Sequence, residues 1–210
     1  MSDSQPDGYL AAPSDGTGKS VLVLHAWWGL NDTIKALCDR LAGAGFVAFA
    51  PDLYHGKVAD TIPGAEALVG TLDDEQATAD VIAAARYLTG RSAGSSIAVM
   101  GFSMGAFYAL DFSIAEPDLV HAVVVFYGAG PTDYSGSKAA YLGHFAENDT
   151  YEDAEYIAAV EQGIKDAGRP VTFHQYPGTD HWFFEPDRTD AYNEAAAALA
   201  WDRTLAFLQG

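Results

Sequence analysis

Apolar, β-rich runs alternate with helical patterns along this chain, and the alternation restricts its fold more than any other feature. Most of the apolar runs are continuous, as expected of parallel strands covered by helices on both faces. The predicted strands are residues 21–25, 47–50, 96–102, 122–127, 140–145 and 171–176. The predicted helices are residues 32–44, 73–89, 104–115, 151–167 and 189–208. This order predicts an α/β fold with a doubly wound, mostly parallel sheet, helices on both faces and right-handed crossovers.

The ends of these elements carry further signals. Residues 8–13 are predicted to add a short N-terminal edge strand. Asn31 or Asp32 is expected to cap the first helix and Thr189 the last, because short polar side chains accept hydrogen bonds from free amides at helix N-termini. The region 55–72 is rich in glycine and is expected to be a loop.

Length and composition agree with this fold. The 210 residues fit one domain, 1–210, without a large cap domain, and a hydrophobic content of 49% is enough for a substantial core. No apolar run approaches the roughly 20 residues needed to span a bilayer. The N-terminus has neither a basic stretch nor an apolar stretch of the kind found in secretory signals. A cytoplasmic location is therefore expected.

The charge is strongly negative, at −18 from 29 acidic and 11 basic side chains. Nucleic acids and anionic membranes are themselves polyanions, so neither is expected as a partner. Two explanations of the charge stay open: adaptation of the surface to high salt, which screens repulsion between carboxylates, or simply an acidic enzyme. Thermal stability that does not increase from low to molar salt would rule out the first.

Metal and thiol chemistry find little support. The single cysteine, Cys38, cannot form an intrachain disulfide, and its helical spacing with Ile34, Leu37 and Leu41 predicts a buried apolar side chain. No histidine pair has the spacing of a helical zinc motif, and no compact cluster of histidines and carboxylates is visible. We therefore predict no metal.

The segment Gly101-Phe102-Ser103-Met104-Gly105 carries the clearest chemical signal. It follows the apolar run 97–100 and opens the small-residue segment 106–110, which predicts a strand, a sharp turn and a helix. Glycines there allow a turn tight enough to hold the serine hydroxyl clear of the sheet, at a helix N-terminus that favours negative charge. An ordinary glycine turn with a capping serine is the alternative.

Two later loops favour a nucleophilic serine. Asp149 follows strand 140–145 and His181 follows strand 171–176, and the carboxyl ends of parallel strands meet at one edge of a sheet. A serine hydroxyl needs an imidazole to take its proton, and the imidazole needs a carboxylate to orient it. We therefore predict a catalytic triad of Ser103, Asp149 and His181, in the chain order of α/β-hydrolases. Asp180, Glu147 and Asp133 are weaker alternatives for the carboxylate.

A tetrahedral intermediate also needs donors for its oxyanion. The amide of Met104, directly after the serine, is expected to supply one, and the amide of Trp27 in the loop after strand 21–25 the other. His25 is expected to orient this loop rather than to contact the substrate.

Several segments resemble one family in sequence and in order. These are His25-Ala26-Trp27-Trp28-Gly29, Ala50-Pro51-Asp52-Leu53-Tyr54, the 101–105 motif, Phe126-Tyr127-Gly128, the Asp149 loop and Asp180-His181-Trp182-Phe183. Together they resemble the dienelactone hydrolase family of α/β-hydrolases over essentially the whole chain. The resemblance implies a compact enzyme that hydrolyses an ester or lactone without a cofactor.

The chain differs from the namesake enzymes of that family in two ways. Those enzymes use a cysteine nucleophile controlled by a glutamate, whereas Ser103 and Ala26 stand at these positions here. They also hold a substrate carboxylate with arginines, but residues 51–80 contain no arginine and Glu185 stands four residues after the histidine. A neutral or weakly charged small ester therefore fits better than a dianionic lactone.

The resulting prediction is a serine-dependent hydrolase of small carboxylic esters or lactones that works through an acyl-enzyme. Trp27, Tyr54 and Phe102 are expected to border the substrate. A thioester or small-amide hydrolase with the same triad, and a catalytically silent binding protein of this fold, are the alternatives. The sequence does not predict an oligomeric state.

Overall fold

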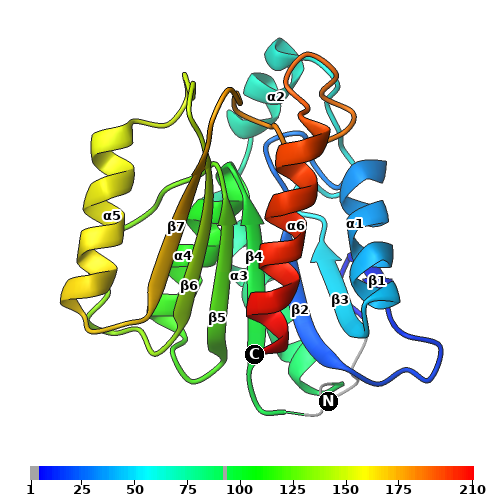
Figure 1. Cartoon of the computed structure of the whole chain (residues 1–210). Coiled ribbons are helices and arrows are strands. Elements are labelled where there is room, and N and C mark those ends of the chain that lie inside the picture. Colours follow the sequence, from blue (N-terminus) through cyan, green and yellow to red (C-terminus); the bar gives the residue numbers. More distant parts are fainter. Residues whose placement is uncertain (1–4, 92–93) are drawn as a thin grey trace.

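The fold is built on one seven-stranded sheet. The computed structural model describes residues 5–91 and 94–210, so the first four residues of the N-terminal segment lie outside the described part. The strands follow the order β1-β3-β2-β4-β5-β6-β7 (Figure 1). Among the strands of the described residues, only β1, at the edge, runs antiparallel to its neighbour β3. Their bounds are β1 Gly8–Ala11, β2 Lys19–Leu24, β3 Phe46–Pro51, β4 Ile97–Phe102, β5 Val120–Phe126, β6 Ala140–Ala146 and β7 Val171–Tyr176. The predicted mostly parallel sheet and its edge strand are confirmed.

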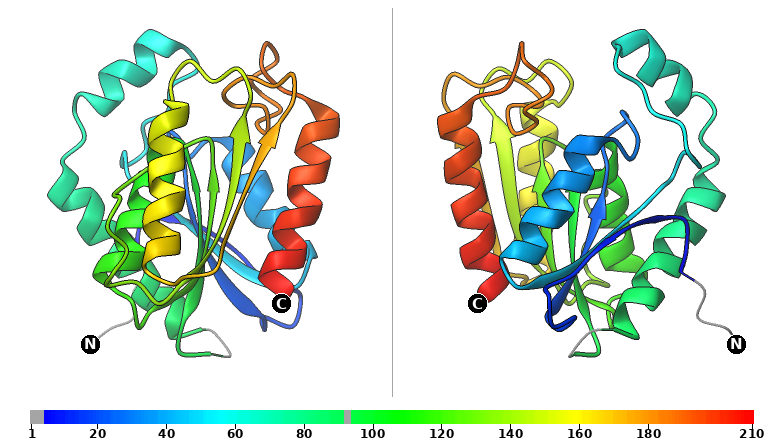
Figure 2. Two further views of the ribbon diagram at one scale, coloured as in Figure 1. Left: turned by 60° about the vertical axis from the view of Figure 1, so that its left-hand side comes forward. Right: turned by 90° about the vertical axis from the view of Figure 1, so that its right-hand side faces the viewer.

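Helices cover both faces of the sheet, as predicted. One face packs against α1 (Asp32–Gly43) and α6 (Glu194–Gln209), and the other against α3 (Asp74–Thr89), α4 (Met104–Ala115) and α5 (Ala154–Asp166) (Figure 2). Each side chain of a strand points to the face opposite its neighbour's, so the continuous apolar runs supply both cores.

A helix that the sequence reasoning missed lies within 55–72. It is α2, Ile62–Val69, which lies beyond the carboxyl ends of the strands (Figure 1). The Thr61 side chain caps it by accepting a hydrogen bond from the Gly64 amide at 3.3 Å. The expectation of a loop was wrong because Pro63 and Gly64, two of the residues behind it, both fall in the first turn of the helix, where proline is tolerated. Only Ala65 of α2 is buried, so the segment has little amphipathic pattern.

The predicted starts of two helices were also wrong. The last helix begins at Glu194 and is capped by Asn193, whose Oδ1 accepts from the Ala196 amide at 3.0 Å; Thr189 is not its cap. Residues 188–193 form turns instead, with the amides of residues 191 and 192 donating to the Arg188 carbonyl. Helix α5 begins at Ala154 rather than at residue 151, because the Asp153 carboxylate caps it. Asn31 caps α1, as one of the two predicted alternatives.

This difference at the last helix gives a direct test. Replacing Asn193 with alanine should lower the free energy of unfolding by about 1 kcal/mol, because one helix amide loses its acceptor. Replacing the exposed Thr189 with alanine should change it by less than about 0.5 kcal/mol, as at other surface positions. Urea unfolding of both variants measures these changes. Equal losses in the two variants would contradict the Asn193 cap.

Candidate active site

Three loops meet at the carboxyl edge of the sheet and bring Ser103, Asp149 and His181 together. Nδ1 of His181 lies 2.8 Å from Oδ2 of Asp149, and Nε2 of the same ring lies 3.0 Å from Oγ of Ser103. The His181 and Asp149 side chains are both buried. With the proton on Nδ1, the imidazole donates to the carboxylate and accepts from the serine hydroxyl. These residues stand 32 and 78 positions apart in the chain, so only the fold brings them together.

Ser103 lies on the tight turn between β4 and α4. Its φ of 48° and ψ of −113° place a non-glycine residue in a strained backbone conformation. The turn is possible because glycines flank the serine at positions 101 and 105, where the surrounding backbone comes too close for any side chain. A Cβ on Gly101 would collide with the backbone of Gly105, and a Cβ on Gly105 would collide with the Leu24 carbonyl oxygen. The Ser103 amide donates to the carbonyl of Phe126 at 3.0 Å, which ties the turn to β5.

The carboxylate of Asp149 is held by its own loop. Its Oδ1 accepts hydrogen bonds from the amides of Tyr151, at 2.9 Å, and Glu152, at 3.0 Å. Nδ1 of His181 lies within hydrogen-bond distance of both carboxylate oxygens, 2.9 Å from Oδ1 and 2.8 Å from Oδ2. The Asn148 amide also donates to the Thr179 carbonyl, so the loops that carry Asp149 and His181 are joined directly.

The alternative carboxylates bind elsewhere. Glu147 accepts from the amide of Gly178, and Asp133 accepts from the amide of Ser135. Asp180 is exposed, although it stands next to His181 in the chain. Of the four carboxylates considered, the structure brings Asp149 to the imidazole.

A buried pair of residues, Tyr127 and Glu185, lies next to the His181 ring. The Tyr127 ring centre lies 4.9 Å from that of His181, and the Tyr127 hydroxyl donates to Oε1 of Glu185 at 2.8 Å. Burial raises the pKa of Glu185 to about 8, and the Tyr127 hydrogen bond only partly offsets this. The carboxyl therefore keeps its proton at neutral pH. Because Glu185 stands on the loop that carries His181, the bond ties this loop to the end of β5.

The amides expected to bind an oxyanion are free. Neither the Met104 amide, at the start of α4, nor the Trp27 amide donates to another group in residues 5–91 and 94–210. His25 orders the Trp27 loop: its Nδ1 donates to the Ala26 carbonyl at 2.7 Å, and its Nε2 accepts from the Leu53 amide at 3.2 Å. Burial lowers the pKa of His25, which keeps the ring in this neutral form.

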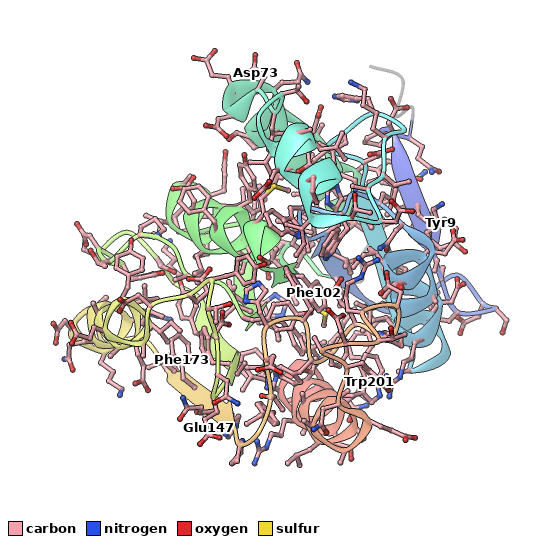
Figure 3. The ribbon with its side chains drawn as sticks, turned by 90° about the horizontal axis from the view of Figure 1, so that it is seen from above. Tyr9, Asp73, Phe102, Glu147, Phe173 and Trp201 are labelled. Atoms are coloured by element: carbon pink, nitrogen blue, oxygen red, sulfur yellow. The ribbon has the colours of Figure 1, made fainter. Side chains whose placement is uncertain are left out.

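Aromatic side chains surround the site unevenly. Trp27 is partly exposed, and its ring stacks on that of Trp182 with 5.8 Å between their centres. Tyr54 is buried and donates to the sulfur of Met104 at 3.3 Å. Phe102, expected to border the substrate, is fully buried and stacks on Phe126, because its side chain points to the sheet face under α1 and α6. Figure 3, which views the molecule from above, places it near the centre.

The sequence reasoning missed Tyr151. Its ring is 48% exposed, and its centre lies 5.0 Å from that of His181 and 5.7 Å from that of Trp27. It therefore forms an aromatic surface between the catalytic candidates and solvent. Its position, two residues after Asp149 in the same loop, was the signal that could have identified it.

The described residues give little support to metal chemistry or to a cysteine nucleophile. Among residues 5–91 and 94–210, no three histidine, cysteine or carboxylate side chains are grouped so that they could hold a metal ion. Cys38 is buried, as predicted, and burial raises the pKa of its thiol to about 12, so it is not a ready nucleophile. Within the same ranges, no helix is both long enough and apolar enough to cross a bilayer.

The fold and this site define an α/β-hydrolase. A model of the dienelactone hydrolase family matches residues 7–210, and the chain belongs to that family. The expected resemblance is thereby confirmed, as is the expectation of an enzyme of the dienelactone hydrolase type.

Known relatives and solved structures agree with this family. The chain is 33% identical to "Protein usf" of Aquifex pyrophilus, over 96% of this chain and 92% of that protein. It is 32% identical to a "probable 2-oxo-3-(5-oxofuran-2-ylidene)propanoate lactonase" of a Bradyrhizobium species, over 96% and 88% of the two chains. A crystal structure from Klebsiella pneumoniae, described as a "putative dienelactone hydrolase", superposes with a TM-score of 0.85 at 25% identity, over 96% and 92% of the two chains.

Proposed function

We propose that this protein hydrolyses small, neutral or weakly charged carboxylic esters or lactones through an acyl-enzyme on Ser103. The observation that carries the proposal is the continuous hydrogen-bonded series from Asp149 through His181 to Ser103, with distances of 2.8 and 3.0 Å. The Bradyrhizobium relative, described as a lactonase, supports a substrate with an ester or lactone bond.

The proposed reaction has two halves. Nε2 of His181 takes the hydroxyl proton as Oγ of Ser103 attacks the carbonyl carbon, and the amides of Trp27 and Met104 bind the resulting oxyanion. The imidazolium then gives its proton to the leaving alcohol oxygen, which leaves an acyl ester on Ser103. Water then attacks the carbonyl carbon of that ester with His181 again as the base. The bond from this carbon to Oγ of Ser103 breaks, the imidazolium returns its proton to Oγ, and the carboxylic acid leaves. Asp149 stays ionised and stabilises the imidazolium.

The charged groups near the site favour a substrate without a strong negative charge. Arg188 lies 4.1 Å over the Trp28 ring, but it is paired with Asp187 at 2.7 Å and also donates to the Asp60 carbonyl. Burial, together with the charge of Asp149, raises the pKa of Glu152 to about 7. A dianionic acid would meet these carboxyl groups and an arginine that is already paired.

A fluorophosphonate probe tests the nucleophile directly. Such a probe reacts with an activated serine, so the folded protein should gain one adduct, and peptide mass spectrometry should locate it on Ser103. Unfolded protein serves as the control, because the hydrogen-bonded series exists only in the fold. Folded protein that stays unlabelled would favour the silent binding protein, and an adduct elsewhere would contradict the assignment of Ser103.

Substrate class requires a separate comparison. Matched ester, lactone, thioester and amide substrates with the same acyl group should show the highest kcat/KM for the ester or lactone. A higher kcat/KM for the thioester or the amide would favour the alternative enzyme.

His25 provides a test of the proposed oxyanion site. The variant His25→Phe loses both hydrogen bonds that order the Trp27 loop, so kcat should fall about ten- to a hundredfold, as expected when a catalytic group is misplaced. KM should change little, because the affected amide binds mainly the transition state. The matched variant His55→Phe, at a half-exposed ring, should keep normal kinetics. A loss of kcat/KM that came only from a higher KM, with kcat unchanged, would contradict the positioning role of His25.

A further inference from the structure

A cavity of about 540 Å³ lies between α1 and α6, on the sheet face opposite α3, α4 and α5. We call it the α1–α6 cavity. Its volume is within the range of small-molecule binding sites. The two helices lie side by side on this face (Figure 2), and the Arg40 guanidinium reaches from α1 to within 3.9 Å of the Trp201 ring centre on α6. Ser103, Asp149 and His181 are not among its lining residues.

The walls of this cavity are mostly apolar. Ile34 and Leu37 line it from α1, Ala198 lines it from α6, and Phe102 and Phe184 line it from the carboxyl edge of the sheet. The two phenylalanine rings pack against each other with 5.8 Å between centres. An apolar body of one ring or a short chain would bury apolar surface here.

One buried polar group on the wall is incompletely satisfied. Glu185 lines the cavity, is 1% exposed, and accepts the Tyr127 hydroxyl on Oε1. Its Oε2 is buried and has no hydrogen-bond partner in residues 5–91 and 94–210. A carboxyl protonated on Oε2 offers one hydrogen-bond donor, and a buried donor without an acceptor is costly. An acceptor oxygen supplied by a ligand would remove this cost.

From this arrangement we infer that the α1–α6 cavity is a binding site, separate from the proposed catalytic site, for a small neutral molecule with an apolar body and one carbonyl oxygen. The apolar body lies between α1 and α6 against Phe102 and Phe184, and the carbonyl oxygen accepts a hydrogen bond from Oε2 of Glu185. The inference does not depend on the proposed reaction at Ser103.

Acetophenone and α-methylstyrene are suitable probes, because they have nearly the same shape and only the ketone has an acceptor oxygen. In a ¹H–¹⁵N NMR titration, both should shift the amide signals of residues 34–37 and 197–198 in a saturable way. The ketone should bind about two- to tenfold more tightly, as expected of one net hydrogen bond. Absence of saturable shifts, or shifts confined to the loops around Ser103, would overturn the inference.

Two exposed alanines of α6 supply matched variants. Ala198 lines the cavity and Ala195 does not, so Ala198→Phe should abolish binding of both probes, whereas Ala195→Phe should leave it unchanged. Glu185→Leu should remove the preference for the ketone. A preference that persists in a folded Glu185→Leu variant would contradict the contact with Oε2. If Glu185→Leu does not fold, Ala198→Phe and Ala195→Phe still test the cavity.

Blocking the catalytic site separates the two proposals. Protein labelled by fluorophosphonate at Ser103 should bind both probes as the untreated protein does. Loss of binding after labelling would show that the cavity belongs to the catalytic site and would overturn the inference. If the protein is not labelled at all, the proposed function fails, and the titration of untreated protein still tests the cavity.

Discussion

Ser103→Ala should lower kcat for p-nitrophenyl acetate by about three to six orders of magnitude, an effect as large as any expected of a single substitution in this chain. Alanine removes the nucleophilic oxygen 3.0 Å from Nε2 of His181 and leaves the rest of the site in place. Only binding and the two amides would then accelerate the reaction. Steady-state kinetics measures the loss, with the wild-type protein diluted over several orders of magnitude so that its rate can be compared with that of the variant.

Another serine supplies the control for this experiment. Ser113 is buried in α4, where its hydroxyl donates to the Leu110 carbonyl at 2.7 Å. Ser113→Ala should therefore affect stability more than kcat. Full p-nitrophenyl acetate hydrolysis by folded Ser103→Ala would refute the proposed nucleophile.

Glu185→Gln should make the protein more stable than the wild type at alkaline pH. Burial raises the pKa of Glu185 to about 8 in the fold, against about 4.3 in an unfolded chain. A raised pKa means that the folded state holds this proton more tightly. The stability that the proton provides is thus fully present below about pH 4 and is lost as pH rises to about 8.

The expected size of this effect follows from the pKa difference. Each pKa unit corresponds to about 1.4 kcal/mol, so the wild type should lose on the order of 4 kcal/mol relative to Glu185→Gln between pH 5 and pH 9. Glutamine stays neutral and can still accept the Tyr127 hydroxyl. Urea unfolding at pH 5, 7 and 9 gives the two stability curves, with exposed Glu66→Gln as the control. Parallel curves for wild type and Glu185→Gln would mean that Glu185 is ionised throughout.

Most of the fold followed from local patterns. Continuous apolar runs predicted six of the seven strands and their parallel arrangement, and the segment at residues 8–13 predicted the edge strand β1. Local patterns failed where helix signals are weak or compete. Helix α2 buries only Ala65, and Thr189 and Asn193 are both good capping residues, so packing decided which of them begins α6.

The candidate site was also predictable in part, because its residues stand at recognisable places relative to the predicted strands. The 101–105 motif lies at a strand end, and loops that follow parallel strands share one edge of the sheet, so Ser103, Asp149 and His181 could be grouped without a structure. Their order along the chain added to this. Nothing local distinguishes a phenylalanine that borders a substrate from one in the core, and Phe102 proved to be fully buried.

By itself, the sequence determined the α/β alternation, the sharp turn at Ser103 and the candidates for its partners, because periodicity and turn chemistry depend on residues close together in the chain. Only the tertiary structure decided that Asp149 rather than Glu147 reaches His181. It alone brought Tyr127 to Glu185, 58 residues apart, and left Oε2 of that carboxyl without a partner beside the α1–α6 cavity. Such contacts depend on side-chain direction and on how loops pack, which residue type and spacing do not specify.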